Sequence, residues 1–450
     1  MKFKKSLLVL SIIIASGCAQ IPEREIESIR STDSFVALID YNYQYNLVSN
    51  YDRDELNIFV NNALRNNYDV NSATLTMINS LYQSRLTNTN RNPSFSASNS
   101  ASKDRNFDTG TSGNTQYSTG VSMSYEVDLW NRLKDERTSK LEEFRASEED
   151  RETVIIATIA SLEESYFKMG YLSDSILYTE DSLDYYNEIL KIADTRYKAG
   201  KTSYLDVLEA QRTVVETESK LKDLYIQSEE NINLFLKLQG LTPDSTLEFS
   251  TTSLEELKFN KIPEEANFSL IENRPDVNAA YSRYIASYHN VEATRKSYLP
   301  TFKLTSNLGY SSNELNNLLQ NPVGSIAANI AYPFLNINER KWNLAISKNE
   351  LESRELAFHN TLLTAAHEVS NAVNNYSKLL DKTTEINKTF ELTKEISKIN
   401  KLKYENGSVD ITDWLTAEEN ERQAKMNVIQ HNYNLILAKI TLYKSLGGKI

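Results

Sequence analysis

The chain has 450 residues with 12 glycines and 8 prolines, a low content that favours long uninterrupted helices. Its formal net charge of −12 argues against nucleic acid or anionic lipid headgroups as partners. The four histidines are dispersed and the sequence holds no phosphate-binding glycine loop, nucleophile elbow or H-E-x-x-H stretch, so we expect neither an enzyme nor a metal site.

Residues 1–17 are predicted to be a lipoprotein signal peptide. Lysines are followed by an apolar run from Leu7 to Ala15 and then by Ser16, Gly17 and Cys18, the single cysteine of the chain. This pattern resembles a bacterial lipobox, although the lipobox prefers leucine where Ala15 stands. The resemblance implies that Cys18 carries diacylglycerol and a fatty acyl chain, with residues 18–53 as a lipidated linker. The alternative is an ordinary signal peptide with an incidental cysteine.

The remainder of the chain is an internal duplication. Landmarks recur at an offset of 207 residues, among them Tyr197 and Tyr404. The other matched pairs are Pro93 and Pro300, Gly200 and Gly407, Asp206 and Asp413, and Gly240 and Gly447. The period is far longer than that of solenoid repeats. We therefore expect two structural repeats, 54–253 and 261–450, each with the order helix, β-hairpin, long helix, turn, helix.

Each repeat contains two stretches with a period of two. In the second repeat the apolar residues of 301–310 share one parity, and those of 325–334 alternate with small or polar residues. The first repeat has a similar run at 117–127 and a weaker one near Phe95. Such runs are typical of outer-membrane barrel strands, and also of half-buried strands in a soluble sheet. We predict β-hairpins at 93–128 and 299–335.

A long helix is predicted after each hairpin. Apolar residues stand seven apart from Ile155 to Tyr197, which is typical of a coiled-coil seam. The segment from Asn131 to Ala199 would be about 100 Å long as one helix. The segments 54–90 and 203–239 are each about half that length, so two of them stacked end to end match one long helix. A plain coiled-coil rod would explain the helices but would leave the strands unused.

Two tight turns, 200–203 and 407–410, separate the long helices from the helices that follow them. Gly200 and Gly407 stand where a helix ends in a left-handed residue. Ser203 with Asp206, and Asp410 with Asp413, are spaced as in a capping box that opens the next helix.

Several motifs in this order resemble those of the TolC-type outer-membrane factors, and in particular the lipoprotein branch paired with proton-driven (RND) efflux pumps. The motifs are 125–133 (YEVDLWNRL), 274–277 (RPDV), 299–302 (LPTF), the two turns and 442–448 (LYKSLGG). The resemblance implies a mixed α and β membrane protein. Its homotrimer would build a 12-stranded outer-membrane β-barrel on a long α-helical coiled-coil periplasmic tunnel.

The strand count leads independently to the same stoichiometry. Four strands cannot close a barrel, and lipid tolerates no open strand edge. Two copies would give eight strands, a barrel that side chains fill, whereas three copies give twelve and leave room for a conduit.

The resemblance also implies functional positions at the turns. Tyr404 and Asp413 match positions of a periplasmic gate, and Asp206 matches the acidic position of the first turn. Val409 and Thr416 depart from the family pattern, so we expect an acidic ring with apolar packing instead of a salt-bridge lock. Helix capping alone is the alternative role for both aspartates. The tips that would contact an adaptor are Gly200, Lys201, Gly407 and Ser408.

The expected function is that of an exit duct in the outer membrane, lipid-anchored and extending into the periplasm, which passively conducts small toxic compounds. Its expected partners are a periplasmic adaptor (membrane-fusion) protein, an inner-membrane RND-type pump and outer-membrane lipid. One alternative is the exit port of a type I protein-secretion system, and another is a structural coiled-coil surface lipoprotein. The sequence does not identify the transported compounds.

Overall fold

The structure is a computed structural model that describes residues 54–105, 112–246, 254 and 268–448. The predicted signal peptide, Cys18 and the linker to residue 53 lie outside the described residues. The first repeat contains α4 (Asp54–Asn66), α5 (Tyr68–Thr89), β1 (Ser94–Arg105), β2 (Ser112–Val127), α6 (Arg132–Lys198) and α7 (Tyr204–Leu238). The second contains α8 (Pro275–Lys296), β3 (Thr301–Ser312), β4 (Pro322–Ala331), α9 (Ile337–Glu405) and α10 (Ile411–Ser445), with 3-10 turns η2 (Phe268–Asn273), η3 (Leu315–Gln320) and η4 (Pro333–Leu335).

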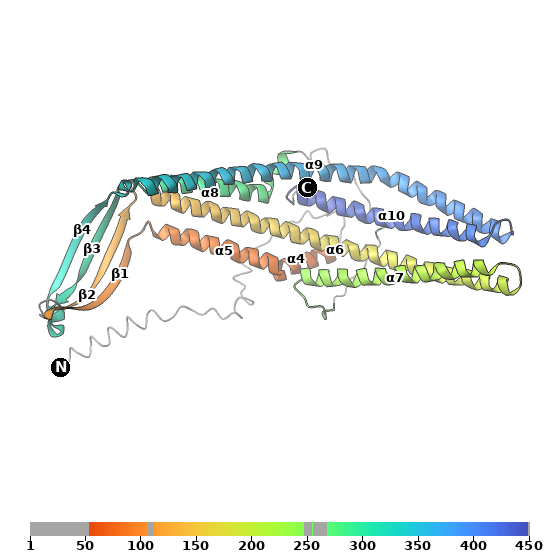
Figure 1. Ribbon diagram of the computed structural model, residues 1–450, viewed down its shortest axis with the longest axis horizontal. Helices are drawn as coiled ribbons and strands as arrows, with labels where there is room; N and C mark the ends of the chain where they lie inside the picture. Colours follow the sequence, from red (N-terminus) through yellow and green to blue (C-terminus); the bar gives the residue numbers. More distant parts are fainter. Residues whose placement is uncertain (1–53, 106–111, 247–253, 255–267, 449–450) are drawn as a thin grey trace. The chain divides into compact units, whose positions relative to one another are not determined.

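The four strands form one antiparallel sheet in the order β1-β2-β3-β4 (Figure 1). The two predicted hairpins are joined through β2 and β3, where Val127 stands opposite Phe302. All four strands meet their helices at the same end of the sheet. The chain therefore passes between helix and strand four times at that end. Outer strands β1 and β4 each keep one edge without a partner in the described part of the chain.

The sheet has one apolar and one polar face, as the alternation predicts. The register places Val121 beside Leu308 and Tyr125 beside Leu304 on the apolar face. On the polar face hydroxyls bond across strands, with 2.6 Å between the Oγ atoms of Ser96 and Ser122. Exposed apolar side chains on a sheet with a polar opposite face indicate an apolar environment such as lipid.

Helix α6 is the centre of the helical region, because it packs against α5 and α7 of its own repeat and against α8 and α10 of the other. Helix α9 packs on α8 and α10. Buried or half-buried residues recur along α9 at alternating steps of four and three, the pattern of a coiled-coil seam, from Ala365 to Tyr404. Within the described residues, none of the helices combines the length and the apolar composition needed to cross a membrane.

The predicted seven-residue column on α6 is only partly correct. It is buried from Ile155 to Met169 but then turns outward, and Tyr197 is 43% exposed. The buried set moves three residues along, to Leu172, Thr179, Tyr186 and Ala193. A straight helix drifts about 20° per heptad against a seven-residue repeat, so one column cannot stay buried along its whole length.

Two predicted boundaries are wrong. The single helix expected over 54–90 breaks at Asn67, whose Oδ1 accepts the amide hydrogens of Asp69 and Val70 and whose Nδ2 donates to the carbonyl of Leu238. The alternating pattern of 325–334 predicts a strand that continues to residue 334. In the structure β4 ends at Ala331, because Pro333 begins a 3-10 turn. Proline cannot donate to a strand ladder, which explains the stop.

The family-like motifs lie at two junctions, one between the repeats and one within the second repeat. Trp130 Nε1 donates to the carbonyl of Pro300 at 2.7 Å, and thereby ties the hairpin ends together. Arg274 pairs with Asp276 and Glu368 and donates to the carbonyl of Ser445, so 274–277 and 442–448 form one junction. The motifs therefore stabilise the scaffold in two places, at the hairpin ends and at the end of α10.

Candidate functional site at the helical turns

The two turns have the same backbone geometry. Gly200 and Gly407 both have φ of +71°, in the left-handed region that glycine enters without strain. The amide of Lys201 bonds to the carbonyl of Arg196 at 2.9 Å, and that of Ser408 to the carbonyl of Lys403 at 2.8 Å. These are the hydrogen bonds of a Schellman cap, as the glycines predict. The four predicted tip residues are exposed.

The helices after the turns begin differently. Ser203 Oγ accepts the amide hydrogen of Asp206 and donates to its Oδ1 at 2.8 Å, and Thr202 also donates to this carboxylate. Half of the capping box predicted for α7 is therefore present: Ser203 caps the helix, but the Asp206 carboxylate bonds to hydroxyls and not to the backbone amide of Ser203. Asp410 stands at the N-cap of α10, but its side chain makes no capping bond, so the second predicted box is absent. Asp413 is exposed, with no hydrogen bond or ion pair among the described residues.

Tyr404 is buried inside the protomer, with 6% of its surface exposed. Its ring stacks on Trp414, with centroids 4.9 Å apart, and the guanidinium of Arg196 lies 4.2 Å from the ring centroid. Burial raises the pKa of Tyr404, an effect that Arg196 opposes and the charge of Asp206 increases. The charge of Asp206 thus acts on the buried ring of Tyr404.

The two turns lie side by side, and apolar packing joins them (Figure 1). One buried cluster combines residues of α6, α7, α9 and α10, including Ile189, Val214, Tyr404 and Leu415. At its edge the hydroxyl of Thr412 donates to Glu209 at 2.7 Å, across the two turns. The two helical pairs of one protomer are therefore bound to each other at their tips.

Sequence reasoning missed the aromatic residues that connect the helical pairs. Tyr185 and Trp414 both donate to Glu418, at 2.9 and 3.0 Å. Tyr186 donates to Glu419 at 2.8 Å. Burial is the main cause of the raised pKa of both tyrosines, and the accepting carboxylate raises each further. The sequence signal that could have indicated this contact is the pair of adjacent tyrosines, Tyr185 and Tyr186, beside the seven-residue apolar column of α6.

The arrangement offers apolar packing and hydrogen bonds between the helical pairs. The residues that the structure describes contain no group of three or more histidine, cysteine, aspartate or glutamate side chains placed to hold a metal ion. The features that can serve a function here are two exposed tips, an exposed acid at Asp413 and a buried aromatic contact between helical pairs.

Comparison with known proteins gives a family match over most of the chain. The model of the family described as outer membrane efflux protein matches residues 59–234 and 269–448. The matched ranges cover most of both structural repeats, including their four strands and both turns.

Similar proteins span nearly the whole chain. Toxin and drug export protein A of Aggregatibacter actinomycetemcomitans is 28% identical over 445 residues, covering 98% of this chain and 97% of the relative. The cation efflux system protein CusC of Escherichia coli strain K12 is 23% identical over 457 residues, covering 98% and 99%.

Solved structures show the same fold. The outer-membrane channel OprN superposes with a TM-score of 0.84 at 21% identity, covering 89% of this chain and 92% of OprN. The CmeC outer membrane channel of Campylobacter jejuni gives a TM-score of 0.83 at 22% identity, covering 90% and 88%. The predicted combination of barrel-type strands with long paired helices is confirmed as the fold class.

Proposed function

Because the chain belongs to the outer membrane efflux protein family, the TolC-type outer-membrane factors, we propose that three copies form an exit duct for small toxic compounds. The duct would receive them from a periplasmic adaptor and an RND-type inner-membrane pump, and would release them outside the cell. The chain would supply a passage, and the pump would supply the energy.

The open sheet edges carry this proposal. The sheet is antiparallel and has an even number of strands, so β4 of one copy can pair with β1 of the next without breaking the alternation. Lipid tolerates no unpaired backbone groups, so a lipid-exposed sheet of this kind must close. Three copies give twelve strands, a barrel wide enough for a conduit.

The helices support the same closure. Helix α5 precedes β1 and α9 follows β4, so the two free sheet edges continue into the helices at the two sides of the helical layer. Both sides expose large apolar residues. On α9, Leu392 and Ile396 are each 53% exposed, and on α5 Leu86 is 68% exposed. A neighbouring copy that pairs with the sheet edge would also cover these side chains.

The closure can be tested by cysteine pairs at the two edges. Ser98→Cys on β1 would be combined with Ser325→Cys, Ala327→Cys or Asn329→Cys on β4, all on the polar face. Within one copy β2 and β3 separate these strands, so a disulfide must join two copies. We expect one pair to give covalent trimers, and purified protein to produce stepwise conductance in planar bilayers. A monomeric native mass, without crosslinks in any pair, would refute the duct.

The turns are proposed as the periplasmic mouth, with Tyr404, Asp206 and Asp413 at the gate and the exposed tips against an adaptor. The shared packing of the two turns supports this role, because it gives one place where the helical pairs can be held together or separated. We also propose that Cys18 bears the lipid anchor, on the strength of the lipobox.

A further inference from the structure

A groove lies between α7 and α10, with α6 as its floor. It is lined by residues of 171–186, 217–227 and 419–430, so it lies away from the turns. Its volume is about 360 Å³, in the range of small-molecule sites. Apolar walls come from Tyr171 and Tyr178 of α6, Leu224 of α7 and Met426 of α10. Tyr171 is held in place by stacking on Tyr433, with ring centroids 5.1 Å apart. The groove is therefore partly preformed.

Two cations line this groove, Lys220 of α7 and Arg422 of α10, and Arg422 reaches across the aromatic floor. Its guanidinium carbon lies 4.7 Å from the ring centroid of Tyr186 and 5.9 Å from that of Tyr178, and Nη1 donates to Ser182. Nε is buried and has no hydrogen-bond partner in the structure. No carboxylate of the described residues lies within ion-pair distance of it. A half-buried guanidinium normally binds a carboxylate through its planar set of donors, and here that acceptor is absent.

Glu418 and Glu419, the acids one turn before Arg422 on α10, are bound to other donors, and Glu419 also lines the groove. Glu418 accepts from Tyr185 and Trp414, and Glu419 accepts from Tyr186. The charge of Glu419 is further offset by Lys220, at 3.0 Å. Asp223 lines the rim but is exposed, where water and salt screen its charge. The acceptor that Arg422 lacks would therefore have to come from outside the described chain.

We propose that this groove binds a small organic carboxylate with a flat apolar body. The carboxylate would lie against Arg422 and Ser182, and the apolar body would lie along the tyrosine and methionine walls. The exposed amide groups of Gln423 and Asn427 line the rim and can bond to polar substituents. The site lies on the helical part of the chain and does not depend on the proposed export role.

The test uses purified full-length protein in amphipol, which avoids detergent molecules in the groove. The probes are 2-naphthoate, its neutral analogue 2-naphthamide and the cationic 2-naphthylmethylammonium, compared by saturation-transfer NMR and calorimetry. We expect naphthoate to bind and the cation not to bind. Arg422→Gln should weaken naphthoate binding about tenfold or more, because it removes a charge-assisted hydrogen bond. Naphthamide binding should change little.

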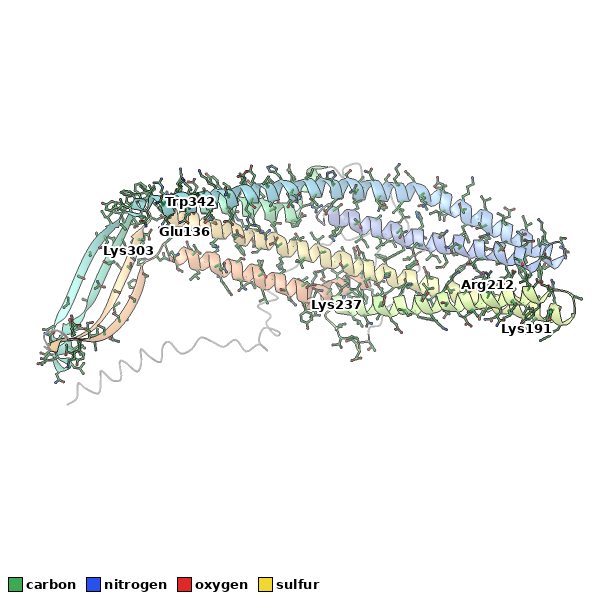
Figure 2. The ribbon with its side chains drawn as sticks, in the orientation of Figure 1. Glu136, Lys191, Arg212, Lys237, Lys303 and Trp342 are labelled. Atoms are coloured by element: carbon green, nitrogen blue, oxygen red, sulfur yellow. The ribbon has the colours of Figure 1, made fainter. Side chains whose placement is uncertain are left out.

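Arg212→Gln is the matched control, because Arg212 is an exposed arginine on α7 that does not line the groove (Figure 2). Asn427→Phe is a second variant that should block the groove while Arg422 stays in place. Circular dichroism would confirm that each variant is folded. Three results would each overturn the proposal: no naphthoate binding to the unaltered protein, equal binding of naphthoate and naphthamide, or unchanged naphthoate binding in both groove variants.

Discussion

Glu163 is an acid inside the helical core. Its side chain is 0% exposed, and neither carboxylate oxygen has a hydrogen-bond partner in the structure. Burial raises its pKa to about 8; the charge of Lys439 on α10 opposes the shift and Glu164 adds to it. A buried carboxyl without hydrogen bonds is favoured in its neutral form.

This leads to a prediction on stability. Between pH 5 and 8 the folded chain holds a proton on Glu163 that the unfolded chain, with an ordinary carboxyl pKa, has released. The free energy of unfolding therefore falls as pH rises through this window, by about 2 kcal/mol or more. Glu163→Gln should remove this slope and raise the melting temperature at pH 8.

The measurement is thermal unfolding followed by circular dichroism at pH 5, 6.5 and 8. Glu188→Gln, an exposed change on the same helix, is the control and should leave the slope as it is. If Glu163→Gln melts with the same pH dependence as the unaltered chain, Glu163 is ionised in the fold and the interpretation is wrong.

The two turn aspartates should separate in experiment. Asp206 is bonded as a cap, so Asp206→Ala should cost about 1 kcal/mol of stability. Asp413 has no such bonds among the described residues, so Asp413→Ala should leave stability nearly unchanged but weaken block by a trivalent cation in planar bilayers. If block and ion selectivity are unchanged in the double variant, neither aspartate belongs to a gate.

For single residues, the sequence predicted those conformations that depend only on the local backbone. Gly200 and Gly407 were predicted as left-handed caps because the requirement for glycine there is a property of the backbone alone. The stacking of Trp414 on Tyr404, and the position of Arg196 over it, were not predicted. The stacking crosses the turn between α9 and α10, and the Arg196 contact joins segments about 200 residues apart. Periodicity within one helix carries no information about its partner.

Among the elements, the strands offer the sharpest test of environment. Leu304 lies on the apolar face beside Tyr125, and Thr305 lies on the polar face beside Ser124. An arginine at mid-bilayer costs about 2–4 kcal/mol on the lipid side, while lumen positions are hydrated. Leu304→Arg should therefore reduce assembly far more than Thr305→Arg, measured as the yield of folded oligomer in membranes. Equal yields would contradict a lipid-facing apolar side.

Helix and strand ends were predicted well where a periodic apolar pattern continued over many residues. Helix α6 spans Arg132–Lys198, within a residue of the predicted ends. The break at Asn67 was missed because the second bond of that side chain goes to Leu238, at the end of α7. Element ends that depend on a distant partner are invisible in a local pattern.

At the scale of the whole molecule, one variant tests the lipid anchor proposed at Cys18. Cys18→Ser should leave the signal segment uncleaved and the protein without lipid, because the serine hydroxyl forms no thioether. Mass spectrometry of the amino terminus gives the result. The oligomer should still form, since the pairing proposed between copies is supplied by β1 and β4. An unlipidated amino terminus in the unaltered protein would reject the lipobox interpretation.

Helix α6 also constrains how the chain can be made. Its neighbours α8 and α10 come from the second repeat, and α10 ends at Ser445, far along the chain from Lys198. At about 5–20 residues per second of synthesis, on the order of tens of seconds separate the completion of α6 from that of α10. During that interval its buried side chains, such as Ile155 and Leu162, lack part of their cover. A nascent chain of this kind therefore exposes apolar surface, and is prone to aggregation, until α10 is complete.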